Sequence, residues 1–185
     1  ALGPQTAEQV LATRHIRGEI ARVTGLDGLR PVAVVSTGVL GCTGVETREL
    51  LSALAREFQP AAVIAVDALA ARSLGRLGCT IQLSTSGISP GSGVNNARPQ
   101  LSRETLGVPV VGIGVPTVVD AGTLAADLLG YAAPKDKVAP RGANMVVTPR
   151  EIDLLIARAA RMVAMAINTA LNPSLSVEEF SILAS

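Results

Sequence analysis

The sequence predicts an α/β fold with three layers, in which a largely parallel or mixed sheet carries helices on both faces. Continuous apolar, β-branched runs such as PVAVVS (residues 31–36) and AAVIAV (61–66) are typical of strands covered on both sides. A loop and a helical segment follow each run, and successive strand-loop-helix units favour parallel pairing. The length of 185 residues predicts one domain over residues 1–185. Because 48% of the residues are hydrophobic but only 2% are aromatic, we expect a core of Ala, Val, Leu and Ile.

The first elements follow directly from periodicity. Residues 4–24 carry apolar side chains at helical spacing and predict an amphipathic helix that ends at Gly25. After the strand over 31–36, the glycine-rich loop TGVLGCTG leads to a helix over 45–58.

The second strand-loop-helix segment begins with the strand over 61–66, which is followed by Asp67 and a helix over 68–78. Residues 79–85 and 108–116 predict two further strands. The long polar segment between them is expected to be functional, because structureless loops of this length are uncommon in compact domains.

The last part of the chain is helical by pattern. A helix is expected over 117–131 and another over 148–172, where Thr148 and Glu151 have the spacing of a capping box. The segment SVEEFSILAS repeats that spacing and predicts a short terminal helix.

Charge and cysteine content exclude several classes of function. Sixteen basic and fifteen acidic residues nearly cancel, which disfavours direct binding to nucleic acid or to an anionic membrane. We find no apolar run near the length of a membrane span and no signal peptide, so a cytoplasmic protein is expected. Cys42 and Cys79 lack metal-ligand spacing and are expected to be reduced thiols.

Asp67 is the leading candidate for chemistry. In open parallel sheets, ligands gather beyond the carboxyl ends of the strands, where this acid and two glycine-rich loops are expected to meet. A helix N-cap is the competing interpretation of Asp67, and the two roles are compatible. We expect no cofactor, with a divalent metal ion at strand-end carboxylates as the alternative.

Other chemistries are weaker. The glycine-rich loops match neither a P-loop nor a dinucleotide fingerprint. Serines such as Ser86 and Ser89 lack the elbow motif of a nucleophile, and His15, the one histidine, is expected on the first helix. Cys42 lacks an evident activating environment.

Long stretches of the chain resemble the germination protease family of spore-forming bacteria. They occur in the family's order and span nearly the whole chain: ALGP, ATRHI, GVLGCTGVET, VIAVDALAARSLGRLGCTIQLS, GISPGSGVNNARPQLSRETLGVPVVGIGVPTVVDA and NMVVTPREIDLLIA. The resemblance implies a peptidase of the spore core, made as a zymogen and assembled as a homotetramer. It also implies a fold like that of the peptidases that mature hydrogenases.

The implied reaction is endoproteolysis of small acid-soluble spore proteins during germination. Those substrates coat DNA, so the enzyme would meet nucleic acid only indirectly, and no membrane is implied. Of the family's two catalytic aspartates, one corresponds to Asp67. The other precedes ALGP, so we expect it directly before Ala1 in a chain that is truncated at its N-terminus.

The resemblance and the loop chemistry together define the expected site. Asp67 is the catalytic residue, and the substrate-binding or supporting residues are Thr43, Glu46, Ser86, Gly87, Gly91, Ser92, Gly93 and Asn95. The family usually has aspartate and threonine where this chain has Thr85 and Ser86. The alternatives are a catalytically inactive or ligand-binding domain of the same fold, or a hydrolase acting on another small substrate.

Overall fold

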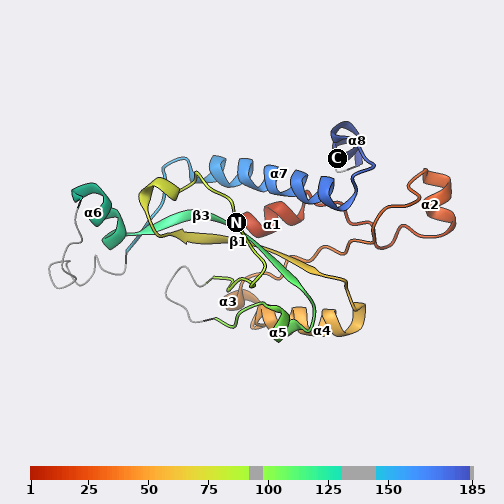
Figure 1. The fold of residues 1–185 in the computed structure, drawn as a ribbon, viewed down its shortest axis with the longest axis horizontal. Helices are drawn as coiled ribbons and strands as arrows, with labels where there is room; N and C mark the ends of the chain where they lie inside the picture. The colour runs from red at the N-terminus through yellow and green to blue at the C-terminus, as the bar shows by residue number, and fades with distance from the viewer. Residues whose placement is uncertain (92–97, 131–144, 184–185) are drawn as a thin grey trace. The chain divides into compact units, whose positions relative to one another are not determined.

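The computed structural model describes residues 1–91, 98–130 and 145–183, which divide into two compact units. One unit contains Ala1–Thr37 and Ala157–Ser185, and the other contains Gly38–Ile156. The α/β class is confirmed: an open, mixed four-stranded sheet lies in the second unit (Figure 1). The prediction of one domain over the whole chain stays a prediction.

The sheet is built around a long central strand. β3 (Val110–Asp120) pairs in parallel with β1 (Val63–Ala71) and antiparallel with β2 (Gln82–Ser84) and β4 (Val146–Val147). Most of β3 is buried, which accounts for its nearly continuous apolar sequence. The sheet is therefore mixed, which is one of the two arrangements that the sequence predicted.

β1 is longer than predicted, and the predicted helix over 68–78 is wrong. The strand continues through Asp67 to Ala71, where it pairs with Val119, and only the 3₁₀ turn η1 (Leu74–Arg76) follows. The eleven residues of β3 offer β1 backbone partners well beyond Asp67. Tertiary pairing has thus overridden the helical propensity of an alanine-rich segment.

The predicted helix over 4–24 is replaced by α1 (Leu2–Ala7) and α2 (Glu19–Thr24). Between them, the Leu11 N–H donates to Oδ1 of Asn168 at 2.9 Å. Because this backbone group bonds to a side chain distant in sequence, the apolar periodicity does not produce a continuous helix.

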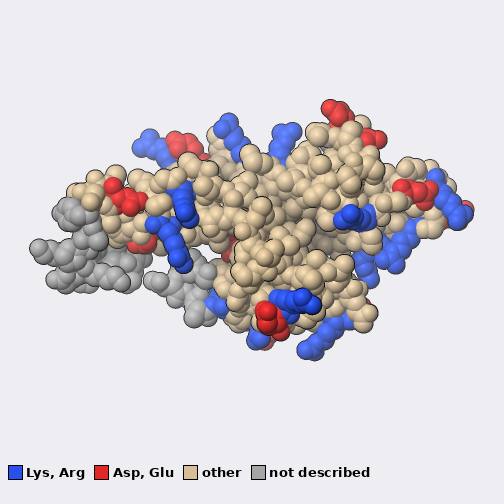
Figure 2. Space-filling model, viewed as in Figure 1, with Lys and Arg blue, Asp and Glu red and all other residues tan. Residues whose placement is uncertain are grey.

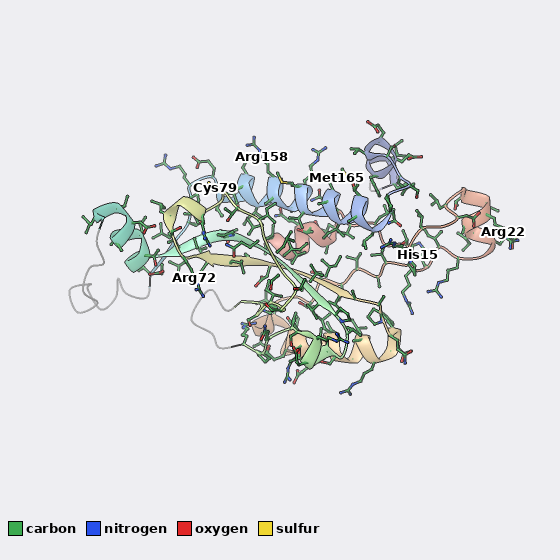
Figure 3. The ribbon with its side chains drawn as sticks, viewed as in Figure 1. His15, Arg22, Arg72, Cys79, Arg158 and Met165 are labelled. Carbon is green, nitrogen blue, oxygen red and sulfur yellow. The ribbon has the colours of Figure 1, made fainter. Side chains whose placement is uncertain are left out.

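The predicted strand over 31–36 pairs with none of the described strands. The carbonyl of Val32 instead accepts hydrogen bonds from the backbone N–H groups of Thr13 and Arg14, at 3.0 and 2.9 Å. His15 follows directly in a turn outside any helix (Figure 3), so its predicted helical position is also wrong.

Among the described residues, four α-helices lie wholly in the second unit. They are α3 (Leu40–Thr43), α4 (Thr47–Phe58), α5 (Arg103–Leu106) and α6 (Ala121–Leu129). α4 and α5 pack against each other, and Figure 1 shows them on the same side of β1 and β3. The predicted helix over 45–58 is therefore confirmed in position.

α6 starts later than predicted because residues 117–120 extend β3. Asp120 ends the strand and caps the helix: its Oδ1 accepts the N–H of Thr123 at 2.8 Å. Hydrogen bonds from Thr123 hold the pKa of the Asp120 carboxyl below its usual range. The chain thus changes from strand to helix at a single acid.

The helices α7 (Ile152–Leu171) and α8 (Val177–Leu183) confirm the two predicted C-terminal helices. The capping box of α8 is also confirmed, because Ser176 and Glu179 exchange two hydrogen bonds between side chain and backbone. The predicted capping box of Thr148 and Glu151 is wrong: α7 begins at Ile152, and the Thr148 hydroxyl donates to the carbonyl of Thr117 at 3.1 Å.

One property of α7 was not anticipated. By length and composition it is apolar enough to cross a membrane, a test that core helices of soluble proteins also pass. Arg158 and Met165 project from it in Figure 3, while Val163 and Ile167 are buried. The expectation that no apolar segment approaches the length of a membrane span is therefore wrong for residues 152–171.

A small apolar cluster supports the sheet where β1 and β3 begin. Leu101, Leu106 and Val110 are buried, and Ala65 and Ile88 pack against them. Burying a leucine side chain stabilises a fold by roughly 1.5–3 kcal/mol. The cluster therefore holds Ile88 and Leu101 against the first residues of β1 and β3.

We predict that Gly114→Ala lowers the free energy of unfolding by about 1–3 kcal/mol, because a Cβ there would lie 2.2 Å from Cδ1 of Leu69. In Leu69→Ala/Gly114→Ala the loss should be smaller than the sum of the single losses, because the clash is gone. Urea unfolding measures all three. Gly41→Ala is the control, since no atom lies within 4 Å of its Cβ position. Equal losses from Gly41→Ala and Gly114→Ala would contradict this packing.

Candidate active site

Asp67 lies in the middle of β1, opposite Gly114 of β3. Its side chain is half-buried, and the chain on both sides of it is strand rather than loop or helix. The N-cap interpretation of Asp67 is therefore wrong. A carboxylate inside a strand has no helix to cap, so its burial requires another source of stabilisation.

That stabilisation comes from the segment over 85–91. The N–H of Gly91 donates to Oδ2 of Asp67 at 2.7 Å. Gly91 has a φ of 72°, in the left-handed region that side chains rarely adopt. The predicted supporting residue Gly91 is thus in direct contact with the acid.

The segment can reach the acid because glycines let it lie close to the sheet. A Cβ on Gly112 of β3 would lie 3.0 Å from Cβ of Ile88 and 3.3 Å from the carbonyl oxygen of Gly87. Gly87 has a φ of 100°, and a Cβ there would lie 2.2 Å from the carbonyl oxygen of Leu101. Ile88 and Leu101 join the two arms of the loop by reciprocal backbone hydrogen bonds.

Opposing influences act on the protonation of Asp67. Burial raises the pKa of its carboxyl above the usual value and is the largest influence. The N–H groups of Gly91 and Ala68 and the charge of Arg98 lower the pKa and oppose burial only in part. The result is a carboxyl that gains a proton more readily than an exposed aspartate.

Arg98 is a residue that sequence reasoning missed. Its Nε, Cδ and Cζ atoms lie 3.4–3.5 Å from the point that a Cβ of Gly91 would occupy. One signal was available, because Arg98 is the single charged residue between Arg76 and Arg103. A lone charge in a long polar segment that follows a candidate acid in the sequence is the signal that points to Arg98.

Three other predicted residues, Ser86, Glu46 and Thr43, form hydrogen bonds with neighbours other than Asp67. The Ser86 hydroxyl bonds to the hydroxyl of Ser84 at 2.8 Å and is exposed. Glu46 is the N-cap of α4 in a reciprocal capping box with Glu49, which supports its structural interpretation. Thr43 ends α3, and its hydroxyl accepts the N–H of Val45 at 3.2 Å.

Three predicted residues lie outside the described part of the chain: Ser92, Gly93 and Asn95. Among the residues that the structure does describe, no three His, Cys, Asp or Glu side chains gather as a metal site would require. Both cysteines, Cys42 and Cys79, are free and exposed. The chemistry that the described site offers is that of one partly buried carboxyl beside backbone N–H groups and an arginine.

The direction of the Asp67 pKa gives a test by stability. Because burial raises this pKa in the folded chain, the group stabilises the fold below its unfolded pKa, and this contribution is lost as pH rises through the folded pKa. Asp67→Asn removes the dependence. The free energy of unfolding of Asp67→Asn relative to the parent chain should therefore increase between pH 3 and pH 7, as measured by urea unfolding.

Asp120→Asn is the control for that series. The pKa of Asp120 is lowered, so its contribution is present above its unfolded pKa and is lost as pH falls through the folded pKa. The relative stability of Asp120→Asn should thus change in the opposite direction. A falling or flat difference for Asp67→Asn would contradict the burial of Asp67.

Comparisons with known proteins are consistent along the chain. A family model described as germination protease matches residues 1–135. Curated germination proteases are similar to the chain over most of its length. That of Caldanaerobacter subterraneus subsp. tengcongensis is 42% identical and that of Clostridium acetobutylicum 37%, each covering 98% of this chain and 64% of the relative. That of Bacillus pumilus is 38% identical, covering 95% of this chain and 63% of the relative.

The chain therefore spans a little under two thirds of the length of these relatives. The family model covers well over half of this chain, including Asp67 and the segment that crosses the sheet beside it. The resemblance found in the sequence is confirmed, and the chain belongs to the germination protease family.

Proposed function

We propose that the chain is the catalytic part of an endopeptidase that degrades small acid-soluble spore proteins during germination. Membership of the germination protease family supports a peptidase. The observation that carries the proposal is Asp67, a half-buried carboxyl with one oxygen held at 2.7 Å by the Gly91 N–H. A carboxyl whose pKa is raised suits proton transfer near neutral pH better than an exposed aspartate does.

In the proposed reaction, ionised Asp67 accepts a proton from water while the water oxygen attacks the peptide carbonyl carbon. The C–N bond then breaks, and the leaving nitrogen receives a proton. Gly91 holds Oδ2, so the carboxylate keeps its orientation during the proton transfer. The second catalytic aspartate that is expected from the sequence resemblance would donate a proton to the carbonyl oxygen or the leaving amine.

The same proposal extends to the setting of the enzyme. The enzyme would act in the spore core, be made as a zymogen and work as a homotetramer with a fold like that of hydrogenase-maturation peptidases. It would need no cofactor and would not bind nucleic acid directly. The near balance of sixteen basic and fifteen acidic residues supports the last point, and Figure 2 shows side chains of both signs on the surface.

The test uses the full-length processed protein, its Asp67→Asn form and a purified acid-soluble spore protein. Loss of a general base costs about 10²–10⁴-fold in rate, so we expect kcat/KM of Asp67→Asn to fall by at least 10²-fold. Discrete fragments identified by mass spectrometry provide the rate. Asp120→Asn, which alters a carboxyl at the start of α6, should cleave at the parent rate.

Equal cleavage by Asp67→Asn and the parent protein would remove Asp67 from the mechanism. Cleavage by neither would favour a binding domain of the same fold.

Parallel assays with a chelator decide whether a divalent ion takes part, since metal-activated water would lose its reactivity when the ion is removed.

A further inference from the structure

We propose that Arg98 is a positioning residue of the Asp67 site: its side chain lies against Gly91, secures the hydrogen bond from Gly91 to Asp67 and favours the ionised carboxylate. This inference rests on the proposed function for its catalytic meaning. The position of Arg98 beside Gly91 and the effect of its charge on Asp67 can be tested without a cleavage assay. It assigns a role to a residue outside the predicted site.

The first support is the position of Arg98 beside Gly91. Three side-chain atoms of Arg98 lie 3.4–3.5 Å from the point that a Cβ on Gly91 would occupy, so the arginine side chain fills the space next to this glycine. The backbone nitrogen of Gly91 lies 2.7 Å from Oδ2 of Asp67. Arg98 therefore lies against the residue whose N–H holds the carboxylate.

The second support is the way the chain presents Arg98. Residues 86–88 and 100–101 are joined by the paired backbone bonds of Ile88 with Leu101 and by Gln100, whose Nε2 donates to the Ser86 carbonyl at 2.9 Å. The Thr105 hydroxyl in turn donates to the carbonyl of Gln100 at 2.9 Å. The arm that carries Arg98 is thus fixed to the arm that carries Gly91.

The third support is charge. β1, residues 85–91 and β3 contain no ionisable side chain near Asp67, since their other acid is Asp120 at the far end of β3. The acids and arginines within α4 and α5 are exposed. The charge that acts on Asp67 from the described residues is that of Arg98, and it opposes the effect of burial.

These observations also explain how a half-buried acid can work as a base. A base must be ionised before it can accept a proton, and burial works against ionisation. A guanidinium keeps its charge at every relevant pH, so it favours the carboxylate without titrating itself. Arg98 would therefore extend the activity of Asp67 toward lower pH.

The test is an NMR titration of the Asp67 carboxyl carbon in the 185-residue chain and in three variants. In Arg98→Gln the titration midpoint of Asp67 should rise, because an opposing positive charge is lost. In Arg98→Lys it should return toward that of the parent chain, because the charge is kept. Arg103→Gln removes an exposed arginine from α5 and should leave the midpoint unchanged.

An unchanged midpoint in Arg98→Gln, or equal midpoints in Arg98→Gln and Arg98→Lys, would overturn the proposal. The parent chain alone supplies a second measurement if a variant fails to fold. Raising the salt concentration should move the Asp67 midpoint upward as the arginine is screened, and a constant midpoint would also overturn the proposal.

Cleavage assays separate this inference from the proposed function. If the full-length protein cleaves its substrate, kcat/KM of Arg98→Gln should fall about threefold or more on the acid limb of the pH profile and recover at higher pH. Arg98→Lys should retain the parent profile. If no form cleaves, the NMR titration still decides the role of Arg98.

Discussion

The site depends on how closely one loop can approach the sheet. Gly112 of β3 has no side chain, so the backbone at Gly87 and Ile88 lies directly on the strand. Gly87 and Gly91 both adopt left-handed conformations, which turn the loop so that the Gly91 N–H meets Asp67. A hydrogen bond to a charged group is worth about 1.5–3 kcal/mol, enough to offset part of the cost of burying the carboxyl.

This arrangement brings a loop that turns at two left-handed glycines onto a partly buried acid. Active sites often hold an ionisable group in an environment that its own chemistry disfavours, because the surrounding fold maintains it. Here the apolar cluster around Leu101 and Leu106 fixes one arm of the loop, and the capping box of α5 follows in the chain. The fold therefore holds Gly91 in place, and Gly91 orients the acid.

Sequence reasoning located the acid but misjudged the element that carries it. Asp67 followed by an alanine-rich segment has the pattern of a helix start, yet β3 is long enough to keep that segment in the sheet. Strand length depends on a partner distant in sequence, which local propensity cannot reveal. The same limit explains residues 31–36, whose apolar pattern predicted a strand although Val32 bonds to Thr13 and Arg14.

Elements with local signals were predicted better. The capping box of α8 depends on Ser176 and Glu179, three positions apart, and was predicted from sequence. Gly91, a predicted supporting residue, does contact Asp67, whereas Arg98 was missed because its place beside Gly91 depends on the paired arms of the loop.

The most direct test of the hydrogen bond between Gly91 and a raised-pKa Asp67 is the pH titration of the Gly91 amide proton shift. We predict a midpoint above the usual aspartate value that disappears in Asp67→Asn; an amide shift that does not titrate with Asp67 would contradict this hydrogen bond.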